Sequence, residues 1–496
     1  MMDARYEKYI TMSVIFLFVF GISLSFAFKT DKFASSESYS QLRQIENIKE
    51  KGTPLIYDDL SYSGRVHVLL PLFHYLVAFV SLFIPALIAA KIVPSFFLAL
   101  ISIAVYYIAF HLTKNKTASG LSALISGFVP ILFSFSVTTV SDLSLSVFLI
   151  LLCMYYFINL SDKPYHFLTC FVILVITTPL SMIFVLVLIF YTGLATIEKI
   201  KIEREEYEMT IFLIFLTSWF LFIVFKKALL THGITIFWHN LPSAVINEYF
   251  VKTNILVAIT QIGAIPFLFG LYTIHKHTFE TKNKIVTLVL SFIAVAFICL
   301  WFNIITPEVG LSLLGIMMVI ILSNYFKLFI LHIEKFKLNL KALSFFLIIL
   351  VFLATSVYPS LYFASKAIEN APKEETFQSM DWIRRNTEPN SVILTHPKLG
   401  SLVNYVAQRK NVADTDFLMI KDSEEIWKDI ENIYSSRYAT EAVELITKYD
   451  VDYILISELE AKEFIIGDYF GSKCFKLVYS DKVKIYKSEC KIKTIQ

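Results

Sequence analysis

Long apolar runs alternate with short polar loops along the first 360 residues. Runs long enough to cross a membrane as helices lie near 8–28, 92–112, 119–136, 143–160, 166–178, 180–197, 209–225, 253–274, 285–302, 309–327 and 342–360. A hydrocarbon core roughly 30 Å thick needs about 20 predominantly apolar residues in a helix, and the two runs around Thr178 and Pro179 are short by that measure. The pattern predicts a polytopic α-helical protein with about eleven transmembrane helices.

A twelfth apolar segment, residues 69–90, is interrupted by Pro71, His74 and Pro85. If it does not cross the membrane, the lysines and arginines of the short loops fall mostly on one side, which the positive-inside rule assigns to the cytoplasm. If it crosses, nearly every loop breaks that rule. We therefore predict an interfacial or re-entrant helix inside a long first external loop, about residues 29–91.

The same rule orients the ends of the chain. Arg5 and Lys8 precede the first apolar run, which we interpret as a retained signal anchor with a cytoplasmic N-terminus. The first loop, the turns at 137–144 and 303–308, and everything after about residue 361 then share the extracytoplasmic face. Acidic residues from separate loops can meet there.

The tail after about residue 365 changes character. Helical periods in "FQSMDWIRRN" and "SEEIWKDIENIYSSRYATEAVELITKY" alternate with strand-like "SVILTH" and "DYILIS". We predict a transmembrane domain over 1–364 and a soluble extracytoplasmic α/β domain over 365–496. Cys474 and Cys490 flank a hairpin pattern, which leaves two alternatives: a disulfide if the domain is extracytoplasmic, or two free thiols.

Composition agrees with a membrane protein and narrows its partners. The chain is 56% hydrophobic, contains 46 phenylalanines and has a mean hydropathy of +0.64, which a water-soluble particle could not cover with polar surface. Its net charge of +3 and the lack of basic runs interleaved with aromatics argue against nucleic acid. We expect a multi-pass protein of the cell membrane with membrane lipid as a partner.

Two acids stand out as candidate catalytic residues and metal ligands. Glu37 follows the first apolar run by about nine residues, and Asp142 begins another helix in a turn with no other charge. Carboxylates from two loops suit a hard divalent cation such as Mg²⁺ or Mn²⁺, which keeps water or phosphate oxygens in its shell. The alternative for Asp142 is a helix N-cap, and for Glu37 a general base whose pKa is raised by partial burial.

Other polar residues near these acids are candidates for substrate binding. Arg65 could hold a phosphate through its two guanidinium nitrogens, or simply anchor to lipid headgroups. Asp58 could instead be a solvated surface residue. Glu308 could instead be an ordinary acid in the first turn of a helix that begins with a proline. The full set of these candidates is Tyr39, Arg43, Asp58, Arg65, His74 and Glu308.

The run "SESYSQLRQIENIKEKGTPLIYDDLSYSGRVHVLLPLFHYLVA" resembles the first external loop of GT-C class membrane glycosyltransferases, in particular archaeal and bacterial relatives of the oligosaccharyltransferase catalytic subunit. Glu37 stands where that family usually has aspartate, Gln41 where many members have histidine, and Asp142 where the second acidic motif begins. In the tail, "DWIRRNTEPNSVILTHPKLGSLVNYVAQRKNVADTDF" is similar in outline. The resemblance implies transfer of a sugar from a polyprenyl-phosphate-linked donor on the external face.

Three departures leave the acceptor open among a protein, a lipid and a glycan. The family's WWDYG motif is replaced by "THPKLGS" at 395–401, the second acidic motif is reduced to Asp142-Leu143-Ser144, and a late arginine has no counterpart in "NIITPEVGLSLLG". Two other functions stay open: a lipid-linked sugar transporter or flippase, and a non-catalytic scaffold of a glycosylation system. Few charged residues lie inside the apolar runs, which disfavours transport.

Overall fold

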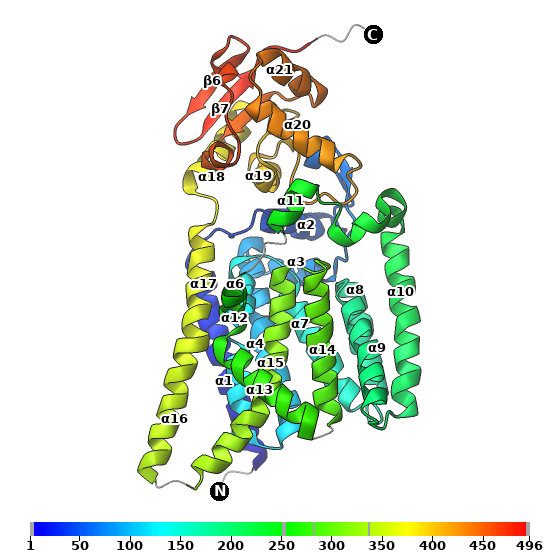
Figure 1. The fold of residues 1–496 in the computed structure, drawn as a ribbon. Helices are drawn as coiled ribbons and strands as arrows, with labels where there is room; N and C mark the ends of the chain where they lie inside the picture. Colours follow the sequence, from blue (N-terminus) through cyan, green and yellow to red (C-terminus); the bar gives the residue numbers. More distant parts are fainter. Residues whose placement is uncertain (1–3, 250–253, 281–282, 336–337, 493–496) are drawn as a thin grey trace.

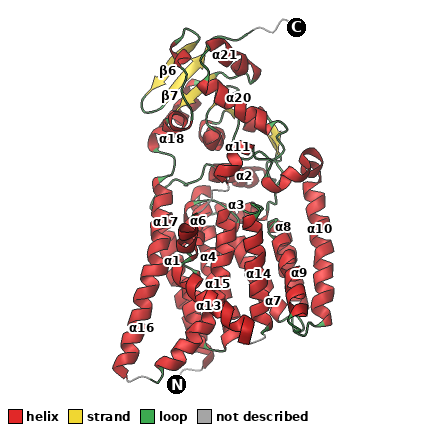
Figure 2. Cartoon of the chain, in the orientation of Figure 1, coloured by secondary structure: helices red, strands yellow, loops and turns green. Residues whose placement is uncertain are grey.

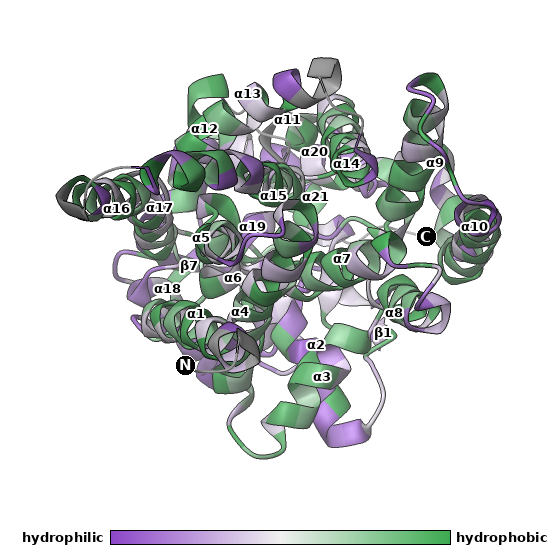
Figure 3. Ribbon diagram, turned by 90° about the horizontal axis from the view of Figure 1, so that it is seen from below, coloured by the Kyte–Doolittle hydropathy of each residue, from purple (hydrophilic) through white to green (hydrophobic). Residues whose placement is uncertain are grey.

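The structure, a computed structural model, describes residues 4–249, 254–280, 283–335 and 338–492. A layer of roughly parallel helices carries a smaller α/β part at one end, and the N-terminus lies at the opposite end (Figure 1). The strands gather in that smaller part (Figure 2). Seen from below, the helices are largely hydrophobic on their outer faces as well (Figure 3), as expected for helices surrounded by lipid.

Six helical stretches among the described residues are long and apolar enough to span a membrane, or up to eight if each of two bent pairs is one span. The long helices are α1 (Ala4–Ala27), α4 (Ala86–Thr113), α10 (Arg204–His232), α14 (Lys284–Trp301), α15 (Pro307–Ile333) and α16 (Leu338–Phe352), the last continuing through Leu353–Val357 into α17 (Tyr358–Glu369). Shorter apolar helices are α7 (Leu143–Ile158), α8 (Pro164–Thr177) and α9 (Ser181–Ile197). The multi-pass helical prediction is confirmed; the count of eleven is not.

Glycine and proline explain why two predicted spans are bent. The run 119–136 divides into α5 (Lys116–Ser126) and α6 (Pro130–Thr138), which meet at 49°. Pro130 begins α6 because its missing N–H costs nothing in a first turn. The run 253–274 divides into α12 (Ile255–Ile262) and α13 (Ala264–Glu280), which meet at 93° around Gly263 with φ of 105°.

The first loop contains α2 (Glu37–Lys51), the short strands β1 (Tyr57–Asp58) and β2 (Arg65–Val66), the 3₁₀ turn η1 (Ser61–Ser63) and α3 (Leu72–Ser81). Helix α3 has ten residues, about 15 Å of helix, so it is too short to cross a bilayer. The bounds predicted for the interfacial segment were too wide, because Pro85 ends it and residues from Ala86 on begin α4. Helices α2 and α3 lie between the helical layer and the α/β part (Figure 1).

The α/β part is built on a five-stranded sheet in the order β4-β3-β5-β7-β6. Its strands are β3 (Val392–Leu394), β4 (Lys410–Asn411), β5 (Tyr453–Ile456), β6 (Phe475–Ser480) and β7 (Lys484–Ser488), and its helices are α18 (Glu374–Asn386), α19 (Pro397–Leu402), α20 (Ser423–Ser435), α21 (Ala439–Lys448) and α22 (Glu458–Glu463). Strand β3 pairs in parallel with β4 and β5, and the β6–β7 hairpin adds antiparallel strands. Helix α17 runs across the boundary predicted at residue 364.

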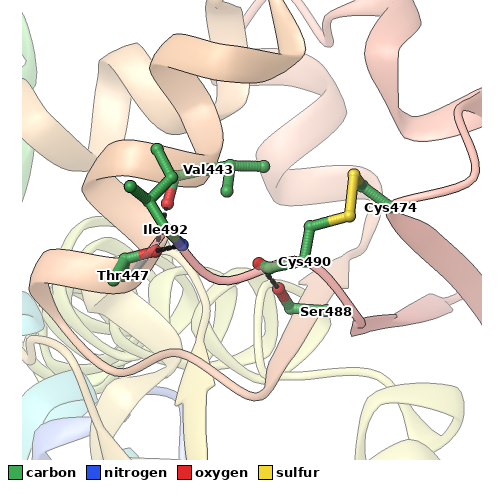
Figure 4. The surroundings of a disulfide bond; sticks show 6 residues. All are labelled: Val443, Thr447, Cys474, Ser488, Cys490 and Ile492. Carbon is green, nitrogen blue, oxygen red and sulfur yellow. Dashed lines mark hydrogen bonds between the residues drawn. A yellow bond between two sulfur atoms is a disulfide. The ribbon is translucent and has the colours of Figure 1, made fainter. Parts of the chain in front are cut away.

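Cys474 and Cys490 form a disulfide across the ends of the β6–β7 hairpin, with their Cα atoms 5.0 Å apart (Figure 4). The backbone N–H of Glu489 also donates to the Cys474 carbonyl. Of the two alternatives that the sequence left open, the structure has the disulfide.

Candidate functional site

The segments that carry the two predicted acids are hydrogen bonded to each other. The Val140 N–H donates to Ser38 Oγ at 3.0 Å, and the Ala34 N–H donates to the Thr138 carbonyl at 2.9 Å. Ser38 is 1% exposed, so this connection is shielded from water. The first loop and the turn before α7 therefore lie on the same face, as the topology argument predicted.

Glu37 is the first residue of α2 and is partly exposed. Burial of its carboxyl and the negative charges of Asp416, Glu308 and Asp414 together raise its pKa to about 7, against the opposing effect of the Thr415 side chain. Glu37 is thus a carboxyl that titrates near neutral pH. Such a group can exchange a proton at the pH where an enzyme works.

Asp142 precedes α7, yet its carboxylate makes no capping bond to the backbone of that helix in the described structure. It instead accepts from Ser146 Oγ at 3.0 Å. Burial raises its pKa, and the hydroxyl groups of Ser146 and Thr178 oppose that rise. The capping explanation is therefore unsupported, and the carboxylate is held by a side-chain hydroxyl of α7 rather than by the backbone N–H groups of that helix.

The structure also brings in acids from two other segments. Glu308, which follows Pro307 at the start of α15, is close enough to raise the pKa of Glu37, and so are Asp414 and Asp416 of the α/β part. These two aspartates lie in "ADTDF", a stretch that showed no helical or strand period. Sequence analysis did not select them as site residues, although two aspartates in a short irregular stretch are a recognisable feature.

Arg65 is buried between the first loop and the α/β part, with its side chain 2% exposed. It lies 3.5 Å from the Asp414 carboxylate and 3.1 Å from that of Asp416, and also donates to the Asp416 carbonyl. His67 lies 3.6 Å from Asp58 and 3.8 Å from Asp416. Burial would lower the pKa of His67, but its hydrogen bonds with these aspartates raise it above the usual value.

Arg43 donates to Asp58 through two nitrogens, at 2.6 and 2.9 Å. Burial would raise the pKa of Asp58, but the His67 hydrogen bond and the Arg43 charge hold it below its usual range. The Tyr39 hydroxyl accepts the Phe33 N–H at 3.2 Å.

His74 on α3 is buried with Nε2 against the Gln41 side chain, and burial lowers its pKa to about 4, so its imidazole is neutral. His74, like Tyr39, Arg43, Asp58 and Arg65, is thus bonded to other protein groups in this structure. Direct substrate contacts by these five residues stay a prediction.

Several solved structures have the same fold over nearly the whole chain. The Archaeoglobus fulgidus oligosaccharyltransferase superposes with a TM-score of 0.70 at 13% identity, covering 93% of this chain and 71% of that one. ArnT from Cupriavidus metallidurans gives 0.56 at 11% identity, covering 98% of each chain, and the mycobacterial arabinofuranosyltransferase AftD gives 0.56 at 10%, covering 98% of this chain and 42% of that one. This chain has the GT-C fold. The predicted resemblance is confirmed at the level of the fold. No protein-family model and no curated protein sequence matches the chain.

The sequence predicted a divalent cation held by Glu37 and Asp142. Within the described residues, no group of three or more His, Cys, Asp or Glu side chains is arranged to hold a metal ion. Glu37 and Asp142 lie on segments that are hydrogen bonded to each other, and neither carboxylate caps a helix in the described part of the chain. Two carboxylates fit Mg²⁺ or Mn²⁺ when the remaining ligands are water or phosphate oxygens.

The segment that stands at the place of the acceptor motif is packed into the α/β part. The Glu460 carboxylate accepts from Thr395 Oγ1 and from the His396 N–H, both at 2.9 Å. Thr395 and His396 are 1% and 0% exposed. This part of "THPKLGS" therefore fixes the start of α19 and does not present side chains to an acceptor.

Proposed function

We propose that the protein is an integral membrane glycosyltransferase that transfers a sugar from a polyprenyl-phosphate-linked donor to an acceptor on the extracytoplasmic face. The fold supports a glycosyltransferase, since it is shared over almost the full chain with proteins of that class. One oligosaccharyltransferase structure holds a dolichol-phosphate together with an inhibitory peptide, and one ArnT structure holds undecaprenyl phosphate. These lipids support a polyprenyl phosphate as the donor carrier.

The observation that carries the proposal is the meeting of acids from four parts of the chain on one face. Glu37 from the first loop lies next to the Asp142 segment and within electrostatic reach of Glu308 and Asp416. A divalent ion held by Glu37 and Asp142 would supply positive charge that stabilises the departing lipid phosphate. Glu37, with its pKa near neutrality, would alternatively take the proton of the acceptor hydroxyl.

Asp142→Asn tests the activity with a change of one atom. Purified protein in nanodiscs is mixed with radiolabelled sugars on dolichyl and undecaprenyl phosphate and with envelope lipids and glycans as acceptors, and transfer of label is counted. We expect the wild type to move label from at least one donor and Asp142→Asn to lose about 100-fold or more of that rate. Asp162→Asn, in the loop at the other end of α7, serves as the control and should keep it.

Two results would refute the enzyme assignment. One is a wild type that leaves every donor intact; the other is an Asp142→Asn variant that transfers as fast as the wild type. Movement of labelled lipid between leaflets without transfer would favour the transporter alternative.

The orientation of the protein rests on its charges and its disulfide. Disulfides persist in oxidising compartments, so the Cys474–Cys490 bond supports an extracytoplasmic α/β part. An Ile465→Cys variant places a thiol at a position that is 85% exposed in that part, and Tyr165→Cys places one at 82% exposure at the opposite end of the helices. In intact cells, a membrane-impermeant maleimide should label the first and not the second.

The native free cysteines, Cys153, Cys170 and Cys299, are buried or partly buried, so the unmodified chain provides the background. Permeabilised cells should label both variants. Labelling of Tyr165→Cys alone in intact cells would place the α/β part in the cytosol and overturn the orientation.

A further inference from the structure

One edge of the five-stranded sheet is covered and the other is open. Strand β4 forms the covered edge, where the Asn411 N–H donates to the Leu60 carbonyl of the first loop at 2.9 Å. Strand β6 forms the opposite edge and lies at the outer margin of the α/β part, away from the helical layer (Figure 2). In the part of the chain that the structure describes, no strand pairs with the outer side of β6. Such an edge can accept a further strand.

The hydrogen bonds of the hairpin show which backbone groups β6 presents on that edge. The Glu489 N–H donates to the Cys474 carbonyl, so these two residues form a hydrogen-bonded pair of the antiparallel hairpin. Bonded and non-bonded pairs alternate along such a hairpin, and residues of the non-bonded pairs turn their N–H and C=O groups outward. Leu477, opposite Tyr486, falls in a non-bonded pair. Its N–H and C=O therefore face the open edge, and the residue is 45% exposed.

The same hairpin carries two lysines that repel each other. Lys476 and Lys487 lie directly opposite across β6 and β7, and both are exposed. Like charges at directly opposite positions destabilise a pair of strands. Lys482 of the same hairpin is paired with Glu375, whereas neither Lys476 nor Lys487 forms an ion pair with any described residue. Two positive charges beside the open edge are thus left for a partner of opposite charge.

The two faces of the hairpin differ in character. Successive side chains of a strand point to opposite faces, so Lys476 and Lys487 share one face, and Leu477 and Tyr486 share the other. An extended peptide in which acidic and apolar residues alternate matches both faces at once. Its acidic side chains would lie beside the lysines and its apolar side chains beside Leu477, while its backbone bonds to the Leu477 N–H and C=O.

We propose that β6 is a docking edge for an extended acidic segment of a partner protein, which adds to the sheet as a further strand. Backbone hydrogen bonds supply affinity in this mode of recognition, and the side-chain match supplies specificity. Lysines on an edge strand can also act only to prevent unwanted strand pairing, and that role predicts no acidic ligand. The proposal goes beyond the glycosyltransferase function and does not depend on it.

The test measures binding of a fluorescent peptide of alternating glutamate and valine to the full-length protein in phosphatidylcholine nanodiscs, by fluorescence anisotropy. We expect Lys476→Gln combined with Lys487→Gln to weaken binding about tenfold or more, and high salt to weaken it as well. The matched control combines Lys421→Gln with Lys462→Gln, which removes two exposed lysines of the α/β part outside the hairpin. This control should stay within about twofold of wild type.

A change in the peptide separates strand addition from simple charge attraction. A fully N-methylated peptide has the same charge but cannot donate backbone hydrogen bonds, so its binding should be weaker by about tenfold or more. Leu477→Pro, which removes the outward N–H of β6, should weaken binding in the same way. Leu477→Ala keeps that N–H and should bind more tightly than the proline variant. Melting temperatures show whether each variant keeps its fold.

Three results would overturn the proposal. The first is a wild type that binds no acidic peptide, which would show that the lysines only protect the edge from other strands. The second is an N-methylated peptide that binds as tightly as its parent. The third is an acidic polysaccharide, polygalacturonate, that displaces the peptide as effectively per charge as the unlabelled peptide does, which would make this edge a general polyanion surface.

Discussion

Replacing Glu37 by glutamine is expected to lower the rate of sugar transfer by at least about 100-fold while the protein keeps its fold. Glutamine has the same shape but can neither accept a proton nor contribute a full charge to a cation. Either role of Glu37 therefore predicts a large loss. The measurement is the transfer rate of purified protein, with the melting temperature as a check on folding. Glu50→Gln, at an exposed position on the same helix, should leave the rate unchanged.

The pH dependence of the same reaction follows from the position of Glu37. Its pKa is raised to about 7, so below that pH the carboxyl is increasingly protonated and transfer should fall about tenfold per pH unit. Above it the rate should level off. Glu308→Gln removes a negative neighbour, which lowers the pKa of Glu37 and should move the acidic limb to lower pH. A Glu37→Gln variant with an unchanged rate and profile would remove Glu37 from the mechanism.

The sequence alone predicted that the protein is helical and multi-pass and which of its loops share a face, and particular residues show why. Apolar runs predicted a multi-pass helical protein, and the distribution of lysines and arginines among the short loops predicted that segment 69–90 does not cross. The bonds between Ser38 and Val140, and between Arg65 and Asp416, show that the predicted segments do share a face. Helix bounds were harder, because the sharp bend at Gly263 depends on how its neighbours pack.

The site was predictable only where a residue's own position carried the information. Glu37, Asp142 and Glu308 could be selected because each is an acid beside an apolar run. Asp416 could not, because its importance comes from partners far away in the sequence. For Arg65 the sequence indicated a guanidinium that binds a phosphate or anchors to lipid headgroups, and the structure instead pairs it with two aspartates about 350 residues later.

Arg65→Met should be among the most destabilising changes in the protein. Removing one member of a buried ion pair leaves its partners without compensation, at a cost of about 3–5 kcal/mol. Asp414, only 2% exposed, would keep its bond from Ser61 Oγ but lose the cation beside it. Hydrogen exchange should increase in residues 57–67 and 411–417, which face each other across this contact, and the melting temperature should drop.

His67 adds a pH dependence of known sign to this contact. Its pKa is raised in the folded protein, so it stabilises the contact fully below about pH 6.5, its unfolded value, and this contribution is lost as pH rises through the higher folded value.

Arg385→Met is the matched control for Arg65→Met, because Arg385 forms an exposed ion pair with Asp381. Its loss should lower the free energy of unfolding by at most about 1 kcal/mol. Adding Asp414→Asn and Asp416→Asn to Arg65→Met should recover part of the stability, because the uncompensated charges are then gone. Equal melting temperatures for Arg65→Met and Arg385→Met would show that the α/β part is held on the first loop by its other hydrogen bonds instead, such as that from Asn411 N–H to the Leu60 carbonyl.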